Sequence, residues 1–336
     1  MTHAVISTEF GWSCSCEDHS FRKICCKHIH GVEISLKLRR AVKESVVLDV
    51  VDVSCCQYCK SENLKKAGIR KNKTHNIQVY QCKDCKKRFS TNLGFEKMHA
   101  SPQVITSAMQ LYFTGESLRG VQKFLKLQGI NMSHVSIFKW IKKYTKLMDI
   151  YLQTITPQVG EKWHADEVWL KINGDKKYLF AMMDNETRFW IAQEVADTKF
   201  QHNANRLLKM GKDTAKKVPS VFVTDGLPSY NKAFEQEYAP KNDFQKPSKH
   251  IRDIHFKHQL SNNNIQERLN GEFRDREKIF RGLKKDDSST IIGIQLYHNY
   301  IREHMSLDGK TPSEKAGIII NGDNKWLTII QNASRK

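Results

Sequence analysis

The nine cysteines of the chain are confined to its front: all of them lie before residue 86, and residues 86–336 contain none. The N-terminus has no basic segment followed by an apolar run, so we expect an intracellular protein, in which disulfides rarely persist. Clustered free thiols at short spacings are typical of zinc sites. The cysteine distribution therefore predicts small, metal-dependent modules ahead of a larger thiol-free region.

The first cysteine cluster has the pattern C-x-C, nine residues, then C-x-H. Structural zinc takes four thiolate or imidazole ligands, so the pattern predicts a site formed by Cys14, Cys16, Cys26 and His28. A strand-like stretch precedes the cluster and a helical one follows it, and the arrangement resembles the SWIM zinc finger. Alternatives for the fourth ligand are Cys25, His19 and His30. A set of buried free thiols is the rival interpretation.

The second cluster contains two C-x-x-C knuckles separated by 22 residues, which is a strong zinc signal. The expected ligands are Cys56, Cys59, Cys82 and Cys85, with Cys55 as the unused neighbour. Residues 60–88 contain ten basic and two acidic side chains, which favours a zinc ribbon that contacts a phosphate backbone. A purely structural ribbon is the alternative. Because four protein ligands leave no open position, both zinc sites are predicted to be structural.

The charge of the chain is strongly positive and unevenly spread. Of a formal net charge of +19, residues 1–160 carry +13 and residues 161–336 carry +6. A basic front half favours a polyanionic partner, because each neutralised phosphate releases counterions. No apolar run approaches the roughly 18 residues of a membrane helix. A length of 336 residues indicates two or more domains.

Residues 101–153 show helical periodicity in three segments. Ser101 before Pro102 is a helix start signal, Gly115 and Gly129 end the first two segments, and Ser133 is expected to cap the third. Two short helices, a turn and a longer basic helix indicate a helix-turn-helix that binds DNA. A three-helix bundle without a DNA-binding role is the alternative.

The third of these helices is expected to bury one face and to present the other to a DNA groove. The side chains predicted to pack inward are Val135, Phe138, Ile141 and Tyr144. Those predicted to contact DNA are Ser133, His134, Ser136, Lys139, Lys142 and Lys143.

From residue 161 the pattern changes to three antiparallel strands, a helix, a strand, a helix, a strand and a long helix. That order is typical of an α/β RNase H-like fold with a mixed five-stranded sheet, and it places the first and fourth strands side by side. Asp166 lies within the first strand and Asp225 ends the fourth. Two converging carboxylates repel each other unless a cation lies between them, and hard oxygen ligands suit Mg²⁺. Two other acids are expected to be structural: Glu167 on the opposite strand face, and Asp184 in a turn.

A third carboxylate is expected from the helix over residues 263–281, which contains Glu267 and Glu272. At about 100° per residue, Leu269 and Phe273 form a packing stripe, and Glu267 lies away from it on one face with Arg274. Glu272 lies beside the stripe and is expected to pair with Arg268 or Arg276. The two glutamates therefore point in different directions from the helix and cannot both serve one site.

Residues 161–318 resemble the catalytic domain of DDE-type insertion-sequence transposases of the integrase-like group. The segments that carry the resemblance are “WHADEVWLKINGDKKYLFAMMD”, “VTDGLPSYNKAF”, “NNNIQERLNGEFRDR” and “HNYIREHMSLDGKTPSEKAGI”. The resemblance implies a triad of Asp166, Asp225 and Glu267, with Arg274 as the accompanying basic residue. The ribbon and the helix-turn-helix are similar to the usual front end of such proteins, whereas the SWIM-like finger is a departure.

The chain is thus expected to be multi-domain, with small zinc-binding modules, a helical DNA-binding domain and an RNase H-like catalytic domain. The expected division is a SWIM-like zinc finger at 1–45, a zinc ribbon at 52–92, a helix-turn-helix at 100–153, the catalytic domain at 160–318 and a C-terminal tail at 319–336.

The resemblance implies a DNA transposase that cleaves and joins strands, with Mg²⁺ or Mn²⁺ at the triad and Zn²⁺ at two structural sites. Its partners would be the terminal inverted repeats of an insertion sequence, target DNA, and at least one further copy of the chain when DNA is bound. No membrane or small-molecule substrate is expected, and the location would be the prokaryotic cytoplasm, at the nucleoid. The rivals are a domesticated zinc-dependent DNA-binding regulator and an RNase H-like nuclease that cleaves without joining.

Overall fold

The computed structural model of the chain divides into two compact units, Met1–Val46 and Val47–Lys336. The structure describes residues 3–8, 11–22, 25–33, 45–51, 53, 55–71, 76–90, 92–240, 248–252, 264–280, 283 and 289–335. The expected continuation of the fifth strand beyond residue 252 lies outside these ranges. No helix within them is long and apolar enough to cross a membrane.

The N-terminal unit is built around its cysteines. Strands β1 (Val5–Thr8) and β2 (Gly11–Cys14) pair antiparallel, helix α1 (Glu17–Arg22) follows, and residues 27–33 are helical. The buried core consists of three cysteines and one isoleucine: Cys14, Cys16, Cys26 and Ile29. So small a core supplies little hydrophobic stabilisation, which is why a unit of this size usually needs a metal or a disulfide.

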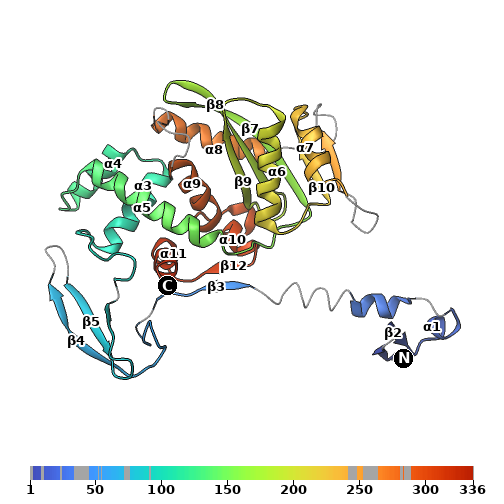
Figure 1. The fold of residues 1–336 in the computed structure, drawn as a ribbon, viewed down its shortest axis with the longest axis horizontal. Helices are drawn as coiled ribbons and strands as arrows, with labels where there is room; N and C mark the ends of the chain where they lie inside the picture. The colour runs from blue at the N-terminus through green and yellow to red at the C-terminus, as the bar shows by residue number, and fades with distance from the viewer. Residues whose placement is uncertain are drawn as a thin grey trace. The chain divides into compact units, whose positions relative to one another are not determined.

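The second cysteine cluster lies in a three-stranded antiparallel sheet of β4 (Leu64–Lys71), β5 (Asn76–Cys82) and β6 (Arg88–Ser90), in the order β4-β5-β6 (Figure 1). Its buried core is again small and consists of Cys56, Cys82 and Phe89. The side chains of β4 are exposed or half-buried along its whole length, so its lysines and arginine face solvent. Ahead of this sheet, β3 (Val46–Leu48) pairs with β12 (Ile318–Ile320).

Three helices follow: α3 (Pro102–Thr114), α4 (Leu118–Leu127) and α5 (His134–Leu152). The expected starts are present, because the hydroxyls of Ser101 and Ser133 accept hydrogen bonds from the backbone N–H groups of Val104 and Ser136. Ser117 caps α4 in the same way. Each cap satisfies a backbone donor that the helix itself leaves without a partner.

The predicted inward face of α5 is wrong for two of its four residues. Val135 is 49% exposed and Phe138 is 43% exposed. The buried stripe instead contains Ile137, Trp140, Ile141, Tyr144 and Met148. Because α5 runs on to Leu152 and packs along its whole length, the long stripe from Ile137 to Met148 sets its rotation.

A five-stranded mixed sheet forms the centre of the larger unit. Its strands are β7 (Lys162–Ile172), β8 (Asp175–Asp184), β9 (Trp190–Ala196), β10 (Val221–Thr224) and β11 (Lys249–Arg252). The order is β11-β10-β7-β8-β9, with β10 parallel to both β7 and β11. The expected pairing of the first and fourth strands is confirmed, and the sheet has the strand order of an integrase-like RNase H core.

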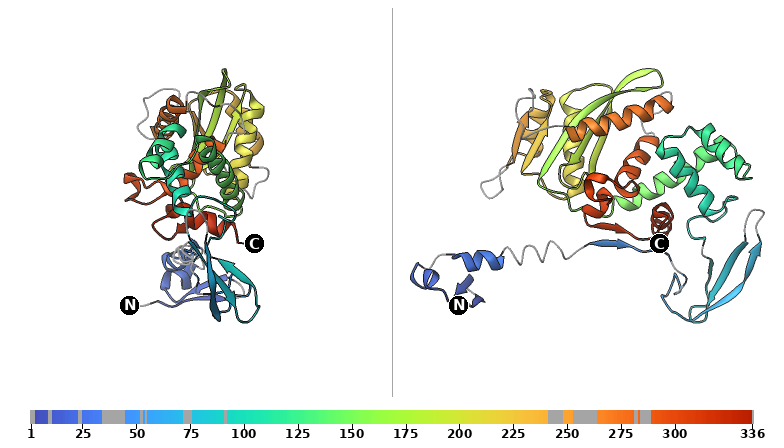
Figure 2. Two further views of the ribbon diagram at one scale, coloured as in Figure 1. Left: turned by 90° about the vertical axis from the view of Figure 1, so that its left-hand side faces the viewer. Right: turned by 180° about the vertical axis from the view of Figure 1, so that it is seen from behind.

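Helices cover both faces of this sheet. The helices α6 (Gln201–Ala215) and α7 (Ser229–Glu237) lie on one side, and α8 (Asn264–Phe280) lies on the other, against β7 (Figures 1 and 2). Leu269 and Phe273 of α8 are buried, as the helical periodicity predicted. Alternate residues of β7 therefore face different helices.

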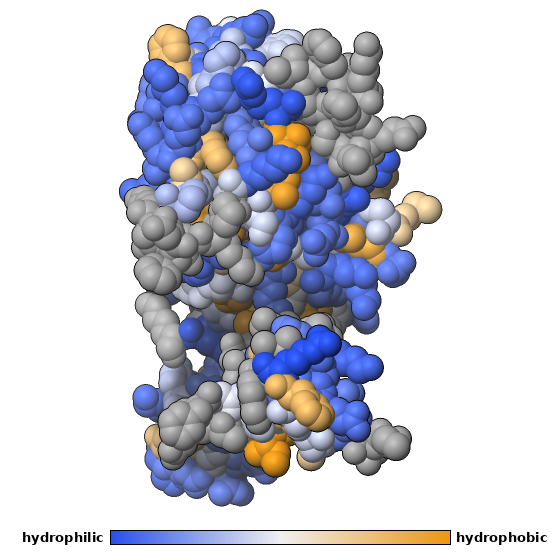
Figure 3. All heavy atoms as spheres, turned by 90° about the vertical axis from the view of Figure 1, so that its right-hand side faces the viewer, coloured by the Kyte–Doolittle hydropathy of each residue, from blue (hydrophilic) through white to orange (hydrophobic). Residues whose placement is uncertain are grey.

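The surface in Figure 3 is mostly hydrophilic, with apolar side chains in small separate groups.

The C-terminal segment packs against the helical region and is not a tail. After α9 (Ser289–Leu296) come a π-helical turn (Tyr297–Ile301), a 3-10 turn (Met305–Leu307), α10 (Pro312–Lys315), β12 and α11 (Lys325–Ala333). Trp326 of α11 is buried, stacks on Phe113 and donates a hydrogen bond of 2.8 Å to the side chain of Gln110. The prediction of a tail at 319–336 missed this because segments distant in the sequence, α3 and α5, bury the apolar residues of α11 together with β12 and the π-helical turn.

A glycine sets how closely α3 approaches α9. A Cβ added at Gly293 would lie 2.1 Å from Cζ of Phe113, which is fully buried. We predict that Gly293→Ala lowers the free energy of unfolding by about 1–3 kcal/mol, because a well-packed core resists added volume. Thermal unfolding measures the change. The matched control is Gly271→Ala on α8, where a Cβ meets nothing within 4 Å. There the better helix propensity of alanine should stabilise by about 0.5–1 kcal/mol. Equal effects of the two substitutions would contradict this account.

Candidate active site

The register of two parallel strands brings Asp166 and Asp225 together. Thr224 of β10 pairs with Ala165 of β7, so the next residue on each strand is an aspartate. Ligand oxygens of Asp166, Glu167 and Asp225 all lie within 4.8 Å of one another. The carboxyl end of a strand at an open sheet is where α/β proteins commonly bind ligands. The pairing of the two aspartates expected from the strand order is therefore present.

Asp166 faces α8 and is held by two hydrogen bonds. The side-chain amide of Asn270 donates to Oδ2 at 2.7 Å, and the backbone N–H of Glu167 donates to Oδ1 at 2.8 Å. Burial, and then the charge of Asp225, raise the pKa of Asp166 to about 6, although these hydrogen bonds and Lys199 act in the opposite direction. The site thus holds a carboxylate whose negative charge is under-compensated.

Glu167 faces the other side of the sheet, as predicted, yet it lies closer to the aspartates than the sequence indicated. Its side chain is 2% exposed and forms an ion pair with Lys199. Its second oxygen, Oε2, has no hydrogen-bond partner among the described residues. Burial is the main cause that raises the pKa of Glu167 to about 7. The alternation of side chains along a strand correctly predicts which face of the sheet each residue occupies. It does not show that Asp225, at the end of a strand, lies close to residues on both faces.

The structure does not bring Glu267 into this cluster of carboxylates. Glu267 and Arg274 are both exposed on α8, and Asn270, between them, is the residue that contacts Asp166. Glu267 precedes Asn270 by three residues and Arg274 follows it by four, so the three share one side of the helix. The sequence analysis did not single out Asn270. Lys199 was also missed, because no local pattern links it to β7.

The predicted partner of Glu272 is wrong. Its carboxylate pairs with Arg302 at 2.5 Å, and not with Arg268 or Arg276 on its own helix. Arg302 follows the π-helical turn and reaches α8 from a segment distant in the sequence. The chain after α9 covers this part of α8. Arg302 of that chain therefore pairs with Glu272, in place of an arginine four residues away on α8.

The carboxylate cluster fits a hard divalent cation. Two of the three carboxylates that lie within 4.8 Å of one another, Asp166 and Glu167, have a raised pKa. The only cation that contacts the group among the described residues is Lys199. Oxygen-only ligands favour Mg²⁺ or Mn²⁺ over softer metals. The residues present therefore suit the metal chemistry that the sequence analysis expects.

Both cysteine clusters bring together the four residues expected as ligands. The ligand atoms of Cys14, Cys16, Cys26 and His28 lie within 4.8 Å of one another. The second group does the same, with sulfur distances of 3.6 Å for Cys56–Cys85 and for Cys59–Cys82. A tetrahedron with Zn–S bonds of about 2.3 Å requires sulfurs about 3.8 Å apart. Neither group includes Cys25 or Cys55.

One thiol of the ribbon, that of Cys82, has a lowered pKa. Burial opposes ionisation of Cys82, but hydrogen bonds from the backbone N–H groups of Cys85 and Asp84 prevail and lower its pKa to about 6. Zinc binds the thiolate form, so the ribbon turn favours the state that a metal requires.

The residues predicted to contact DNA are only partly free to do so. The three predicted lysines Lys139, Lys142 and Lys143 are exposed on α5, and so is Lys146. The Ser133 hydroxyl caps α5 and hydrogen-bonds the hydroxyl of Ser136, and His134 is half-buried. The exposed face is therefore formed mainly by lysines, with Val135 and Phe138 between them.

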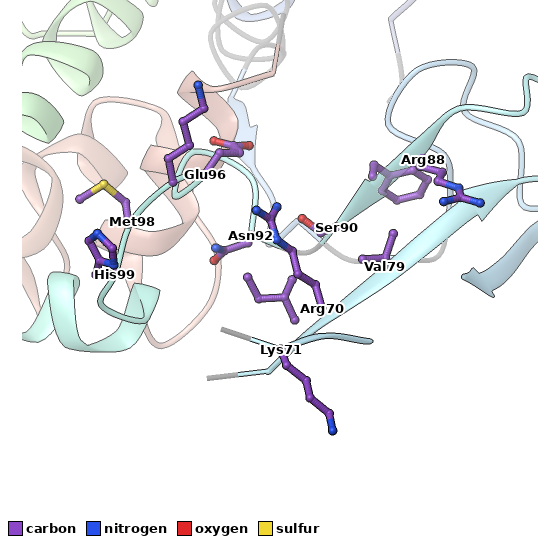
Figure 4. A pocket seen from close by; sticks show the side chains of 12 residues that line it. Arg70, Lys71, Val79, Arg88, Ser90, Asn92, Glu96, Met98 and His99 are labelled. Atoms are coloured by element: carbon purple, nitrogen blue, oxygen red, sulfur yellow. The ribbon is translucent and has the colours of Figure 1, made fainter. Parts of the chain in front are cut away.

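A basic cavity of about 510 Å³ lies between the ribbon and the segment that leads into α3 (Figure 4). Arg70 and Lys71 of β4 and Arg88 of β6 line it from the ribbon, and Lys97 and Glu96 line it from the other side. Four cations against one carboxylate make this cavity suited to a phosphate-bearing strand.

Comparison with known proteins supports a specific family for the sheet domain. Residues 160–304 match the family model of the IS240-type DDE transposase domain. The transposase of the insertion sequence-like element IS431mec of Staphylococcus aureus is 23% identical over 237 residues, which cover 67% of this chain and 98% of that protein. The transposase of IS257 in transposon Tn4003 of the same species gives the same values. Among solved structures, the HTLV-2 integrase catalytic core in complex with magnesium has 13% identity and a TM-score of 0.35, covering 48% of this chain and 98% of that one.

These matches give the sheet domain its class. Residues 160–304 form a DDE domain, and the chain is an enzyme of the kind that cleaves and transfers DNA strands. The three carboxylates described above and the helix α8 lie within the matched residues.

Relief of charge repulsion at Asp166 should be measurable without activity. The pKa of Asp166 rises from an ordinary value of 3.8 to about 6 on folding, so the folded state holds its proton more tightly than the unfolded state. Stability is therefore lost as the pH rises from about 4 to about 6, by at most about 3 kcal/mol at roughly 1.4 kcal/mol per pKa unit. We predict that Asp166→Asn raises the metal-free melting temperature at pH 7 but not at pH 4, while Asp275→Asn on the exposed face of α8 changes neither. A variant less stable than the wild type at pH 7 would contradict this cause.

Zinc content tests the two cysteine sites. We predict that the purified wild-type chain releases two zinc ions to a chromogenic chelator and that Cys82→Ala releases one. The matched controls Cys25→Ala and Cys55→Ala, whose thiols lie outside both ligand groups, should still release two. Loss of an ion from either control would show that the ligand sets are assigned incorrectly.

Proposed function

We propose that the chain is an insertion-sequence transposase that cuts DNA at the ends of its element and joins those ends to target DNA. The observation that carries the proposal is the pair Asp166 and Asp225, aligned on neighbouring parallel strands inside the DDE domain. The closeness of two carboxylates on a rigid sheet is the arrangement that metal-dependent phosphoryl transfer needs.

Asp166, Asp225 and Glu267 would hold Mg²⁺ or Mn²⁺. When bound, the divalent ions neutralise charge that builds up on the attacking and leaving oxygens of a phosphodiester. Asn270 orients Asp166 through its amide. Glu267, one turn earlier on α8, is exposed and free to move toward the aspartates once their repulsion is relieved. Arg274, on the same side of the helix, would contact the DNA backbone.

The reaction proceeds in two displacements without a covalent protein intermediate. Water first attacks phosphorus at the end of the element, and the bond from phosphorus to the 3′-oxygen breaks to release a 3′-hydroxyl. That hydroxyl then attacks a target phosphodiester, forming one phosphorus–oxygen bond as another breaks. Because the two bonds exchanged are alike, joining needs no external energy source.

The front of the chain would recognise the element ends. The lysines of α5 and the basic cavity at the ribbon are both exposed surfaces that suit phosphates. Zinc at the two cysteine groups would hold these small modules folded. Joining both ends of one element needs two active sites, so we infer at least a dimer on DNA, in the bacterial cytoplasm at the nucleoid.

The decisive variant is Glu267→Gln, which removes one charge from α8 and keeps its shape. We predict that strand cleavage and strand transfer in Mg²⁺ fall to background, on the order of 10³-fold or more, while binding to the element end is retained. Gel analysis of a labelled DNA duplex from the element end measures both. Asp275→Asn, an exposed acid of the same helix, is the control and should retain full activity.

The same assay separates the proposal from its rivals. A wild-type chain that cleaves but never yields a joined product would be a nuclease. One that binds the duplex and does neither would be a regulator. Full joining by Glu267→Gln would remove Glu267 from the site and would leave Glu167 as the third carboxylate of the cluster.

A further inference from the structure

A second polar cavity, of about 210 Å³, borders the same helix as the proposed catalytic residues. Its polar lining comes from four segments that are distant in the sequence: Arg188, Arg268, Glu272, His298, His304 and Ser306. We call this the α8 cavity. Polar cavities of this size are normally occupied, by ordered water or by a ligand whose charge matches the walls.

The charges around the α8 cavity are not balanced by protein groups. Nη1 of Arg188 is buried and has no hydrogen-bond partner among the described residues. Burial, and then the charge of Arg268, lower the pKa of Arg188. An arginine stays protonated under such conditions, so two guanidinium groups face one cavity. The carboxylate of Glu272 is already paired with Arg302.

The nearest other carboxylate does not neutralise Arg188. Asp184 is fully buried, and its Oδ2 accepts hydrogen bonds from the backbone N–H and the hydroxyl of Thr187. Its Oδ1 is buried and, like Nη1 of Arg188, has no hydrogen-bond partner among the described residues. The charge of Asp184 attracts Arg188, but no ion pair joins the two among the described residues. Two carboxylates and three arginines therefore leave the region around the cavity positive, with the buried Nη1 of Arg188 still lacking an acceptor.

The histidines of the cavity indicate an anion as well. The side chain of His298 is 6% exposed, and its Nε2 donates to the backbone carbonyl of Arg188 at 2.9 Å. Its other nitrogen, Nδ1, has no hydrogen-bond partner and lies 4.0 Å from the nearest carboxylate oxygen, on Glu272. Nε2 of His304 is likewise buried and without a partner among the described residues. Burial lowers the pKa of both rings, and a negative charge placed beside them would raise it again.

A metal ion does not fit this cavity. Two arginines line it, and its histidines and glutamate do not converge, since none of the metal-capable groups among the described residues includes them. A tetrahedral oxyanion does fit, because guanidinium forks match phosphate oxygens and protonated imidazoles donate to them. Arg268 and Ser306 are exposed at its rim, so a phosphate that is part of a longer strand can enter.

We propose that the α8 cavity binds one backbone phosphate of a DNA strand. Arg188 and Arg268 would hold the phosphate oxygens, and His298 would close the buried end. This proposal rests on the proposed function, because it assumes a DNA substrate. It extends that function by giving α8 two roles: one side borders the carboxylate cluster, and the adjoining side fixes the strand that is presented to it.

Inorganic phosphate is the first probe, because its binding to the α8 cavity can be measured whether or not the chain acts on DNA. In the full chain, ¹⁵N signals of the His298 ring, assigned with His298→Gln, report its protonation at pH 7. We expect added inorganic phosphate to shift them saturably toward the protonated form. The shift should be lost, or need at least about tenfold more phosphate, in Arg188→Gln and Arg268→Gln. The control Lys209→Gln, an exposed cation on α6 across the sheet, should match the wild type.

The second probe is the salt dependence of binding to a DNA duplex from the element end, without added magnesium. Removing one phosphate contact reduces the slope of log K against log salt by about one, so Arg268→Gln should show that loss and Lys209→Gln should not. Arg268 is exposed, and an unchanged melting temperature will show that the variant is folded.

The two probes give distinct outcomes. A saturable phosphate shift with an unchanged DNA slope would mean that the cavity takes a free anion, which overturns the assignment to a DNA strand. No shift and no change of slope would overturn the anion site altogether. Failure of the wild-type chain to bind or cut the duplex would count against the proposed function, and the phosphate probe would still decide whether the cavity binds an anion.

Discussion

The parallel pairing of β7 with β10 is the constraint on which the site depends. It aligns Ala165 with Thr224, and the next residue on each strand is an aspartate. A shift of one residue would turn the two side chains to opposite faces of the sheet. The apolar core beneath, with Trp163 and Phe222 fully buried, holds this register. Two carboxylates are thereby kept close in a partly buried position that neither would occupy alone.

The molecule concentrates charges of opposite sign on the two sides of α8. Toward β7 it contacts a group of carboxylates with too little positive charge, whereas the α8 cavity contains cations with too little negative charge. In the proposals made above, a divalent cation would complete the first group and a phosphate would complete the second. A polyanionic strand with bound metal ions would balance the charges of both groups. Without it, each group of buried like charges destabilises the fold, because burial removes the water that would solvate them.

The helical region is joined to the catalytic sheet by close packing. Phe113 of α3 lies against Gly293 of α9, and Trp326 of α11 stacks on the same phenylalanine. The C-terminal helix thus forms part of the core and keeps α3 and α5 against the sheet domain. The cysteine modules have small cores of their own, so hydrophobic burial alone contributes little to the stability of either module.

The sequence by itself determined the features that depend on neighbours along the chain. Serine caps, the spacing of Cys56 and Cys59, the strand order and the packing stripe of α8 were all readable, because each follows from local geometry or from simple topology. Only the tertiary structure decided the partner of Glu272, the rotation of α5, the contact of Asn270 with Asp166 and the existence of the α8 cavity. Each of these needs a side chain from a distant segment, and the free energy of such contacts depends on burial that no local pattern records.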